Sequence, residues 1–378
     1  MSDCPYCNNK DTQLYYYTNL PFYVWLLSSG EKNFMVPVEI YLCPNCWYAF
    51  NRNPLPEEYI KKLYDDNHFI PSTDTHYPQR GDFYNIVKAN TNKNDCIIEI
   101  GSSNGYLLTL LSDCGYKYLG EINPDPRIDG RIPIQMKNID LSWDISYRSD
   151  IDVFLFDNVF EHLEKPWEYL KIVSNRLTKN GKIIMEFPGY CSCLHHQHVS
   201  FFTLPFLHTI SKESGLTMNV VFHGSSTVTR VIFQKEGSRD KKSHSLGPVE
   251  LEEEKNKILL NTQKVRKDFI NRKTKLNSFL QNTSGEKVYW WGADMWAASL
   301  FSYIEQEWLD ENINFKFIES DESKEGLTFF PASAKVFSAE KTLKNMNIKY
   351  LVLASQSINE MKQKLIEWNC RVENVFHV

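Results

Sequence analysis

The sequence of 378 residues has no apolar run that approaches the roughly 20 residues needed to cross a bilayer. It also has no excess of positive charge, because 42 Lys and Arg residues stand against 47 Asp and Glu residues, for a formal net charge of −5. Binding to nucleic acid needs a basic surface, so this balance disfavours that class of protein. The first residues have no basic segment followed by an apolar core, the pattern of a secretion signal. We therefore expect a cytoplasmic protein with neither nucleic acid nor membrane as a partner.

Cysteine is sparse, but four of the nine cysteines form two CxxC pairs, Cys4 with Cys7 and Cys43 with Cys46. A CxxC turn lets two thiolates face one ion at about 2.3 Å, and two such turns complete a tetrahedron. Four protein ligands leave no open position, so the pattern predicts a structural Zn²⁺ site. A redox dithiol and chance pairing are the alternatives.

The order of apolar and polar segments predicts three domains. Residues 1–80 form the predicted zinc-binding domain. Residues 81–235 alternate strand and helix patterns, as a parallel α/β sheet requires. Residues 236–285 hold a polar linker and a long helix, and residues 286–378 repeat strand, glycine turn and helix as a second, smaller α/β domain. The expected strands include Cys96–Ile100, Tyr116–Gly120, Val153–Phe156, Ile183–Phe187, Lys287–Trp291, Phe315–Ile318 and Lys349–Ala354, and the expected helices include Tyr106–Leu111, Trp167–Leu177, Leu251–Leu280 and Asp294–Ile304.

A glycine turn follows the first strand of the central part. Gly101 and Gly105 allow a sharp bend and a close approach to a ligand, but their spacing differs from the GxGxxG dinucleotide fingerprint. Glu99, just before the bend, suits a cationic amino group, and Glu121 follows where a carboxylate can accept the hydroxyls of a ribose. This set points to S-adenosylmethionine as the cofactor. The predicted cofactor contacts are Glu99, Gly101, Ser102, Asn104, Gly105, Tyr106, Glu121 and Ile122, with Asn158 and His162 from the segment after the fourth strand.

Three histidines fall within four residues after the fifth strand, at His195, His196 and His198. A neutral imidazole is a natural general base near pH 7, which favours proton transfer or substrate hydrogen bonding here. A structural role and a metal-binding role are alternatives, although no carboxylate lies within the segment itself. His198 is the preferred base, His195 or His196 the preferred donor to an enolate oxygen, and Gln197 a residue that positions substrate.

The whole series of features resembles the zinc-containing nucleotide-sugar C-methyltransferases. The resemblance is carried by two CxxC pairs, EIGSxxGYLL, FEHxxxP, an EFP strand, HxHxSFFT, a long helix and a WGA glycine turn. It implies a class I methyltransferase Rossmann-like domain between an N-terminal zinc-binding domain and a C-terminal Rossmann-like α/β domain. It also implies methylation of a ring carbon beside a ketone, in branched-sugar or surface-polysaccharide biosynthesis, by a monomer or small homo-oligomer.

The resemblance further implies that residues near the C-terminal glycine turn and one arginine bind the nucleotide sugar. These residues are Arg230, Trp291, Gly292, Ala293 and Lys324. The family's Tyr-His-Glu-His segment reads His195-His196-Gln197-His198 here, so a tyrosine and a glutamate are replaced. Two alternatives follow: an O-methyltransferase acting on a related glycan precursor, and a degenerate homologue that binds sugar nucleotide without catalysis.

Overall fold

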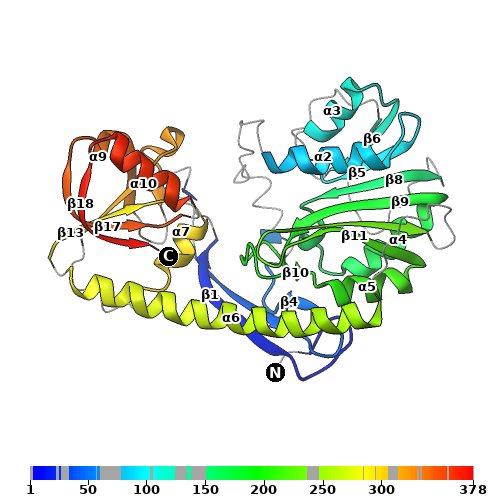
Figure 1. The fold of residues 1–378 in the computed structure, drawn as a ribbon, viewed down its shortest axis with the longest axis horizontal. Helices are drawn as coiled ribbons and strands as arrows, with labels where there is room; N and C mark the ends of the chain where they lie inside the picture. The colour runs from blue at the N-terminus through cyan, green and yellow to red at the C-terminus, as the bar shows by residue number, and fades with distance from the viewer. Residues whose placement is uncertain are drawn as a thin grey trace. The chain divides into compact units, whose positions relative to one another are not determined.

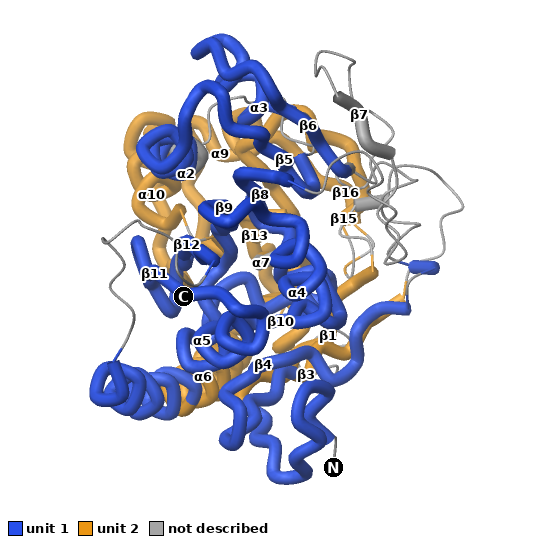
Figure 2. The backbone as a smooth tube through the Cα atoms, turned by 90° about the vertical axis from the view of Figure 1, so that its right-hand side faces the viewer, with its two compact units in different colours: residues 1–14, 40–262 blue, residues 15–39, 263–378 orange. Residues whose placement is uncertain are grey.

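The computed structural model describes most of the chain (Figure 1). The described residues are 3–22, 25–26, 34–56, 58–59, 78–102, 105–123, 134–137, 150–235, 247–283, 285–293, 295–304, 314–329, 332, 334–355 and 357–377. They belong to two compact units (Figure 2). Unit 1 comprises residues 1–14 and 40–262, and unit 2 comprises residues 15–39 and 263–378. No helix among the described residues has the length and apolar character that a bilayer crossing requires.

Unit 1 is built on a seven-stranded sheet of order β11-β12-β9-β8-β5-β6-β7. Its strands are β5 Cys96–Ile100, β6 Tyr118–Asn123, β7 Ile134–Lys137, β8 Ile151–Asp157, β9 Leu177–Pro188, β11 Leu216–His223 and β12 Val228–Lys235. The first five are parallel, and β12 runs antiparallel between β9 and β11. Taken in chain order the strands lie 3-2-1-4-5-7-6, which is the class I methyltransferase arrangement. The predicted fold is confirmed.

Helices cover both faces of this sheet because its strands are apolar on both sides. Ile97, Val153 and Leu155 pack with residues of α2 (Pro78–Asn90) and α3 (Tyr106–Asp113). Their neighbours Ile98 and Phe154 pack on the other face with α4 (Pro166–Arg176) and α5 (Leu204–Glu213). The alternation follows from the two-residue period of a strand. It leaves the carboxyl ends of the parallel strands as the edge where side chains can meet a ligand.

The cysteine-bearing segment joins the core of unit 1. A four-stranded sheet has the order β1-β3-β4-β10, with β1 Gln13–Pro21, β3 Met35–Leu42, β4 Ala49–Asn51 and β10 Ser200–Phe201. Strand β10 follows the histidine segment and pairs antiparallel with β4. Tyr48 stacks on Phe206 of α5, and its hydroxyl shares a 2.6 Å hydrogen bond with Ser200. The cysteine-bearing segment and the histidine segment are thereby held together.

Unit 2 holds a second seven-stranded sheet, of order β18-β17-β13-β14-β16-β15-β2. The strands are β2 Trp25–Leu26, β13 Lys287–Trp291, β14 Asn314–Glu319, β15 Thr328–Phe329, β16 Ala334–Ser338, β17 Asn347–Leu353 and β18 Arg371–His377, accompanied by α7 Met295–Phe301, α9 Ala339–Leu343 and α10 Ile358–Glu367. Five neighbouring strands are parallel in the order 5-4-1-2-3. This is the order of a Rossmann-like sheet, as the sequence predicts.

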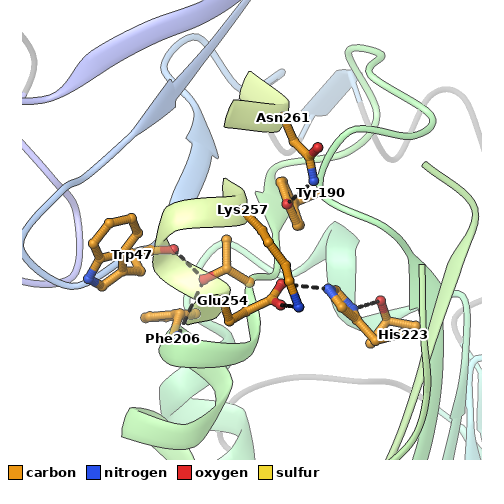
Figure 3. A network of polar contacts seen from close by, with 9 residues as sticks. Trp47, Tyr190, Phe206, His223, Glu254, Lys257 and Asn261 are labelled. Atoms are coloured by element: carbon orange, nitrogen blue, oxygen red, sulfur yellow. Dashed lines mark hydrogen bonds and ion pairs between the residues drawn. The ribbon is translucent and has the colours of Figure 1, made fainter. Parts of the chain in front are cut away.

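The long helix α6 runs from Pro248 to Gln281 and confirms the predicted Leu251–Leu280 helix. Its apolar stripe is divided, because Ile258 lies in its unit 1 part and Leu276 and Leu280 belong to the core of unit 2. In unit 1, Glu254 of this helix accepts a 2.9 Å hydrogen bond from His223 of β11, and Figure 3 shows Lys257 reaching toward the same Glu254 carboxylate.

Two elements differ from expectation. The strand expected at Tyr116–Gly120 is β6, Tyr118–Asn123, so Glu121 lies within the strand. The helix α2 was not predicted, because Gly81 and several polar residues obscure its apolar face, on which Phe83 and Val87 are buried.

Candidate functional site

The four cysteines of the two CxxC pairs converge in unit 1. Their sulfur atoms all lie within 4.8 Å of one another, and the Sγ atoms of Cys4 and Cys46, and of Cys7 and Cys43, are 3.6 Å apart. A tetrahedral Zn²⁺ site with 2.3 Å bonds has sulfur–sulfur edges of about 3.8 Å. The side-chain amides of Asn9 and Asn45 donate to Cys43 and Cys7, as outer-shell donors to thiolates do. The cluster therefore fits a zinc ion.

The glycine turn after β5 has the predicted conformation. Gly101 and Gly105 have φ angles of 73° and 69°, in the left-handed region that glycine tolerates best. A side chain at Gly101 would also collide with the methyl groups of Val159. The Gly101 amide donates to the carbonyl of Ile122 at 2.7 Å, so the bend lies directly against β6. Tyr106 begins helix α3 and is half-buried, and Asn104 lies outside the described residues.

Two carboxylates stand at this bend. Glu99 of β5 and Glu121 of β6 pair in register in the parallel sheet, and each is only 2% exposed. Side chains at paired positions project from the same face of a sheet. Ser102 donates its hydroxyl to the carboxylate of Glu121. Burial raises the pKa of Glu121, and the Ser102 hydrogen bond offsets only part of that effect. A ligand that donates hydrogen bonds would stabilise the charged form of this carboxyl group.

The segment after β8 brings a further backbone bend to the same edge. Asn158 has a φ angle of 53°, unusual for a residue with a side chain, and it is exposed. The backbone amide of Asn158 donates a 2.9 Å hydrogen bond to the backbone carbonyl of Glu186. His162 ends the short helix η1 (Phe160–His162), and its Nδ1 lies 2.9 Å from the carbonyl of Gln197. His162 is thereby held against the histidine segment.

The histidine segment places its rings close together. The ring centroids of His195 and His198 are 3.8 Å apart, and those of His162 and His198 are 4.8 Å apart. The backbone amide of Gln197 donates to Nδ1 of His195, so in the neutral ring the proton is on Nε2. His196 and His198 are buried. Burial lowers the pKa of His195 and of His198 well below the ordinary value, and lowers the pKa of His162 to about 4.

Sequence reasoning missed a carboxylate at this cluster. Glu161 is 2% exposed, and its Oε1 lies 3.8 Å from Nε2 of His198. Burial, with smaller effects from Asp157 and Glu186, raises the pKa of Glu161 to about 8. The two residues are 37 positions apart in the chain, so no local pattern joins them. The FEH motif itself was the available signal, because it places Glu161 beside His162.

Arg230 lies in β12 opposite Glu186 of β9, within a group of charged side chains. Its guanidinium donates to the carboxylate of Glu186 and lies 3.5 Å from Asp82 of α2. The side chain is 8% exposed. Burial raises the pKa of Glu186, while Arg230 opposes that shift. Arg230 is therefore already engaged with carboxylates, and a ligand contact would share its guanidinium with them.

The residues expected to hold a nucleotide in unit 2 surround a second glycine turn. Gly292 has a φ angle of 121° and abuts the carbonyl of Ala354, so only glycine fits. The amide of Ala293 donates to Glu319 at 2.9 Å, a carboxylate at the end of β14 that sequence reasoning did not single out. Trp291 is fully buried and stacks on Trp368, and its carbonyl accepts a hydrogen bond from the Ala354 amide at 2.8 Å, so it supports the turn from the core. Lys324 lies 3.9 Å from Asp321 in the nearby segment.

Comparison with known proteins gives weak likenesses. No protein-family model and no curated protein matches the chain. A S-adenosylmethionine-dependent methyltransferase of Thermotoga maritima, described as a possible histamine N-methyltransferase, is 15% identical over 41% of this chain and 87% of its own, with a TM-score of 0.34. A putative S-adenosylmethionine-dependent methyltransferase of Listeria monocytogenes is 10% identical over 42% of this chain and 99% of its own, with a TM-score of 0.36. Magnesium protoporphyrin IX methyltransferase of Synechocystis, solved with bound S-adenosylmethionine, is 10% identical over 47% of this chain and 96% of its own, with a TM-score of 0.37. The strand order of unit 1 identifies its fold independently of these likenesses.

Proposed function

We propose that this chain is an S-adenosylmethionine-dependent methyltransferase whose substrate is a nucleotide-linked keto sugar. The observation that carries the proposal is the arrangement of Glu99 and Glu121, in register on β5 and β6 beside the left-handed Gly101. Open α/β sheets bind ligands at this edge. Bound there, S-adenosylmethionine would supply an electrophilic methyl group. Glu99 would face its amino group, and Glu121 would accept hydrogen bonds from its ribose.

The fit of the cofactor can be judged from the glycine bend. The side chain of any other residue at position 101 would collide with the methyl groups of Val159, so the bend keeps its close packing only with glycine. A glycine bend beside two buried carboxylates suits a ligand with a cationic end and a ribose. Ser102, Gly105, Tyr106, Ile122, Asn158 and His162 complete the proposed contacts of the described chain.

The histidine cluster is the proposed reaction centre. A histidine takes the proton from the carbon beside the keto group, which leaves an enolate. His195 suits the stabilising role, because its Nδ1 accepts a backbone amide and its Nε2 carries the hydrogen that an enolate oxygen can accept. Gln197 has no ionisable group and would position the sugar.

A nucleotide sugar is the proposed substrate because unit 2 offers a second Rossmann-like strand order with a glycine turn. The turn at Trp291, Gly292 and Ala293 would lie against the nucleotide, Lys324 would pair with its phosphates, and Arg230 would contact the sugar. We further propose that Cys4, Cys7, Cys43 and Cys46 hold a structural Zn²⁺ ion, since four thiolates leave no position for a substrate.

The test combines a variant with product analysis. Purified full-length protein is assayed against nucleotide-linked keto sugars with methyl-labelled cofactor, and carbon-13 NMR distinguishes a new C-methyl group from an O-methyl group. We expect a C-methyl product, and we expect His198→Ala to abolish turnover while cofactor affinity stays unchanged. The matched control, His208→Ala, alters a histidine of α5 and should retain activity.

O-methylation is the second candidate function, favoured by the replacement of the family's tyrosine and glutamate in the segment 195–198. A histidine base serves an alcohol equally well. An O-methyl signal in the same NMR experiment would select it. Full activity of His198→Ala would remove the histidine from the mechanism.

A further inference from the structure

A buried carboxylate and two imidazoles meet at one point of unit 1. One ligand atom each from Glu161, His162 and His198 lies within 4.8 Å of the other two. Glu161 is 2% exposed, yet neither of its oxygens accepts a hydrogen bond from another described residue. Buried carboxylates without partners are costly, and such groups commonly mark the place of an ion. The Glu161 carboxylate is therefore the feature to explain.

The spacing between Glu161 and His198 suits an ion between them. Oε1 of Glu161 and Nε2 of His198 are 3.8 Å apart, which is too long for a hydrogen bond. Two metal–ligand bonds of about 2.1 Å, one to oxygen and one to nitrogen, span such a gap at an open angle. An ion placed there would give the carboxylate the positive partner that the described side chains do not supply.

His162 has the tautomer that metal-binding histidines commonly have. A carbonyl oxygen can only accept, so the contact between Nδ1 of His162 and the Gln197 carbonyl fixes the hydrogen on Nδ1. The lone pair of the neutral ring is then on Nε2. Histidines that bind metals typically donate their other nitrogen to a carbonyl or carboxylate in this way. The backbone of the histidine segment thus sets the tautomer that a ligand needs.

We propose that Glu161, His162 and His198 bind a divalent transition-metal ion at a site distinct from the four-cysteine cluster. Two imidazoles and one carboxylate favour Mn²⁺, Fe²⁺, Co²⁺, Ni²⁺ or Zn²⁺ over Mg²⁺ or Ca²⁺, which prefer oxygen ligands. Three protein ligands leave positions open for substrate oxygens. This inference rests on the proposed function where it assigns the ion a role, which is to polarise the keto group of the sugar.

The site changes the roles of two histidines, because His162, proposed above as a cofactor contact, becomes a metal ligand together with His198. A nitrogen that binds a metal ion has no lone pair left for a proton, so His198 becomes a ligand and another histidine of the cluster takes the proton. The Glu161–His162 pair then explains why FEH stands at the end of β8. The His198→Ala variant loses turnover in either role, so a direct measurement of metal binding is needed to decide.

Cobalt provides that measurement. Co²⁺ is titrated into zinc-loaded, full-length protein without cofactor or substrate, and bound metal is counted by elemental analysis after gel filtration. We expect one zinc and one cobalt per chain. The cobalt should show weak visible bands without the thiolate-to-cobalt charge transfer that cysteine ligands would give. Glu161→Gln should raise the Co²⁺ dissociation constant about 100-fold, whereas Glu164→Gln, which alters an exposed carboxylate of the same segment, should leave it unchanged.

Absence of a second metal in the wild-type protein overturns the proposal, even if a variant fails to fold. So does cobalt binding that persists in both Glu161→Gln and His198→Asn. Calorimetry with S-adenosylhomocysteine on the same sample reports cofactor binding separately. Binding of the nucleoside without a second metal would support the proposed function and overturn the metal site. Binding of a second metal without the nucleoside would support the metal site and overturn the proposed function.

Discussion

Two acidic residues on neighbouring parallel strands are the central side chains of the proposed cofactor site. Glu99 and Glu121 are both buried, and they stand where the sheet presents its carboxyl edge. Ser102 gives Glu121 one hydrogen bond within the protein, while burial keeps its pKa above the ordinary value of 4.5. A ribose that adds hydrogen bonds would favour the charged form, and this coupling makes the residue testable by pH.

Glu121→Gln should weaken binding of S-adenosylmethionine about 10-fold to 100-fold, because a charge-assisted hydrogen bond is lost. In the wild-type protein the ligand lowers the raised pKa, so binding releases a proton between the two pKa values. Affinity should therefore rise with pH between the lower pKa of the complex and the raised pKa of the free protein, and level off above the latter. Calorimetry across this range measures both effects.

In Glu121→Gln the dependence on pH should vanish together with the proton release. Glu319→Gln in unit 2 is the matched control and should bind the cofactor as the wild type does. An unchanged affinity and an unchanged pH profile in Glu121→Gln would exclude Glu121 from the site.

The sequence was sufficient to predict those parts of the candidate site whose residues lie close together in the chain. The bend at Gly101 and Gly105, and the acids on the strands beside it, follow local rules of strand, turn and helix. Glu161 was missed because it meets His198 only after β9 and the segment behind it have folded back. The ion pair of Arg230 with Glu186 was missed for the same reason, since it depends on the antiparallel register of β12 and β9.

Among the elements, the cysteine-bearing segment is held directly against the segment that carries the histidines. Strand β4 pairs with β10, which directly follows the histidines, and Thr203 donates to the carbonyl of Trp47 at 2.7 Å. Tyr6, between the first two cysteines, packs edge-on against Trp167 and Phe206. A zinc ion that fixes this segment would therefore support the position of the histidines as well as the fold.

Cys46→Ala should remove the bound zinc and lower the free energy of unfolding of unit 1 by more than about 3 kcal/mol, because metal binding contributes to folding directly. Elemental analysis and denaturant unfolding measure the two effects. Cys370→Ala, which alters a half-buried cysteine of unit 2, should keep the zinc. Wild-type protein that contains no zinc after purification without chelators would contradict the assignment.

The first turns of α6 are held on unit 1 by a polar network. His223 lies between Thr229 and Glu254, with a 2.9 Å hydrogen bond to each (Figure 3). Although burial alone would raise it, the pKa of Glu254 is lowered by His223 and Lys257. The charged Glu254 carboxylate therefore stabilises the folded protein fully at pH values above its ordinary pKa of 4.5. This stabilisation is lost as the pH falls through the lowered pKa.

Glu254→Gln should reduce the free energy of unfolding by about 1–3 kcal/mol at neutral pH, since a hydrogen bond to a charged group is weakened. The difference from wild type should shrink in acid, as the wild-type carboxylate becomes protonated. Denaturant unfolding at a series of pH values measures this, with the exposed Glu253→Gln as control. Equal loss in the two variants would show that the network does not hold the helix.

At the scale of the whole molecule, two Rossmann-like sheets belong to one chain. Their strand orders were predictable in kind, because each region alternates buried strands with helices after a glycine turn. The limits of the two compact units were harder to predict from the sequence, because residues 15–39 belong to the same unit as the C-terminal sheet. Strand β2 pairs with β15 about 300 residues later in the chain, and no local pattern encodes such a partner.

The central claim is that unit 1 binds S-adenosylmethionine, a sulfonium nucleoside, through the carboxylates of Glu99 and Glu121. Titration calorimetry of S-adenosylmethionine and S-adenosylhomocysteine into folded, zinc-loaded protein tests it most directly, with NAD as a comparison ligand. We predict one binding site per chain for both nucleosides, weakened in Glu99→Gln, and no comparable heat with NAD. Absence of binding by both nucleosides would contradict the account.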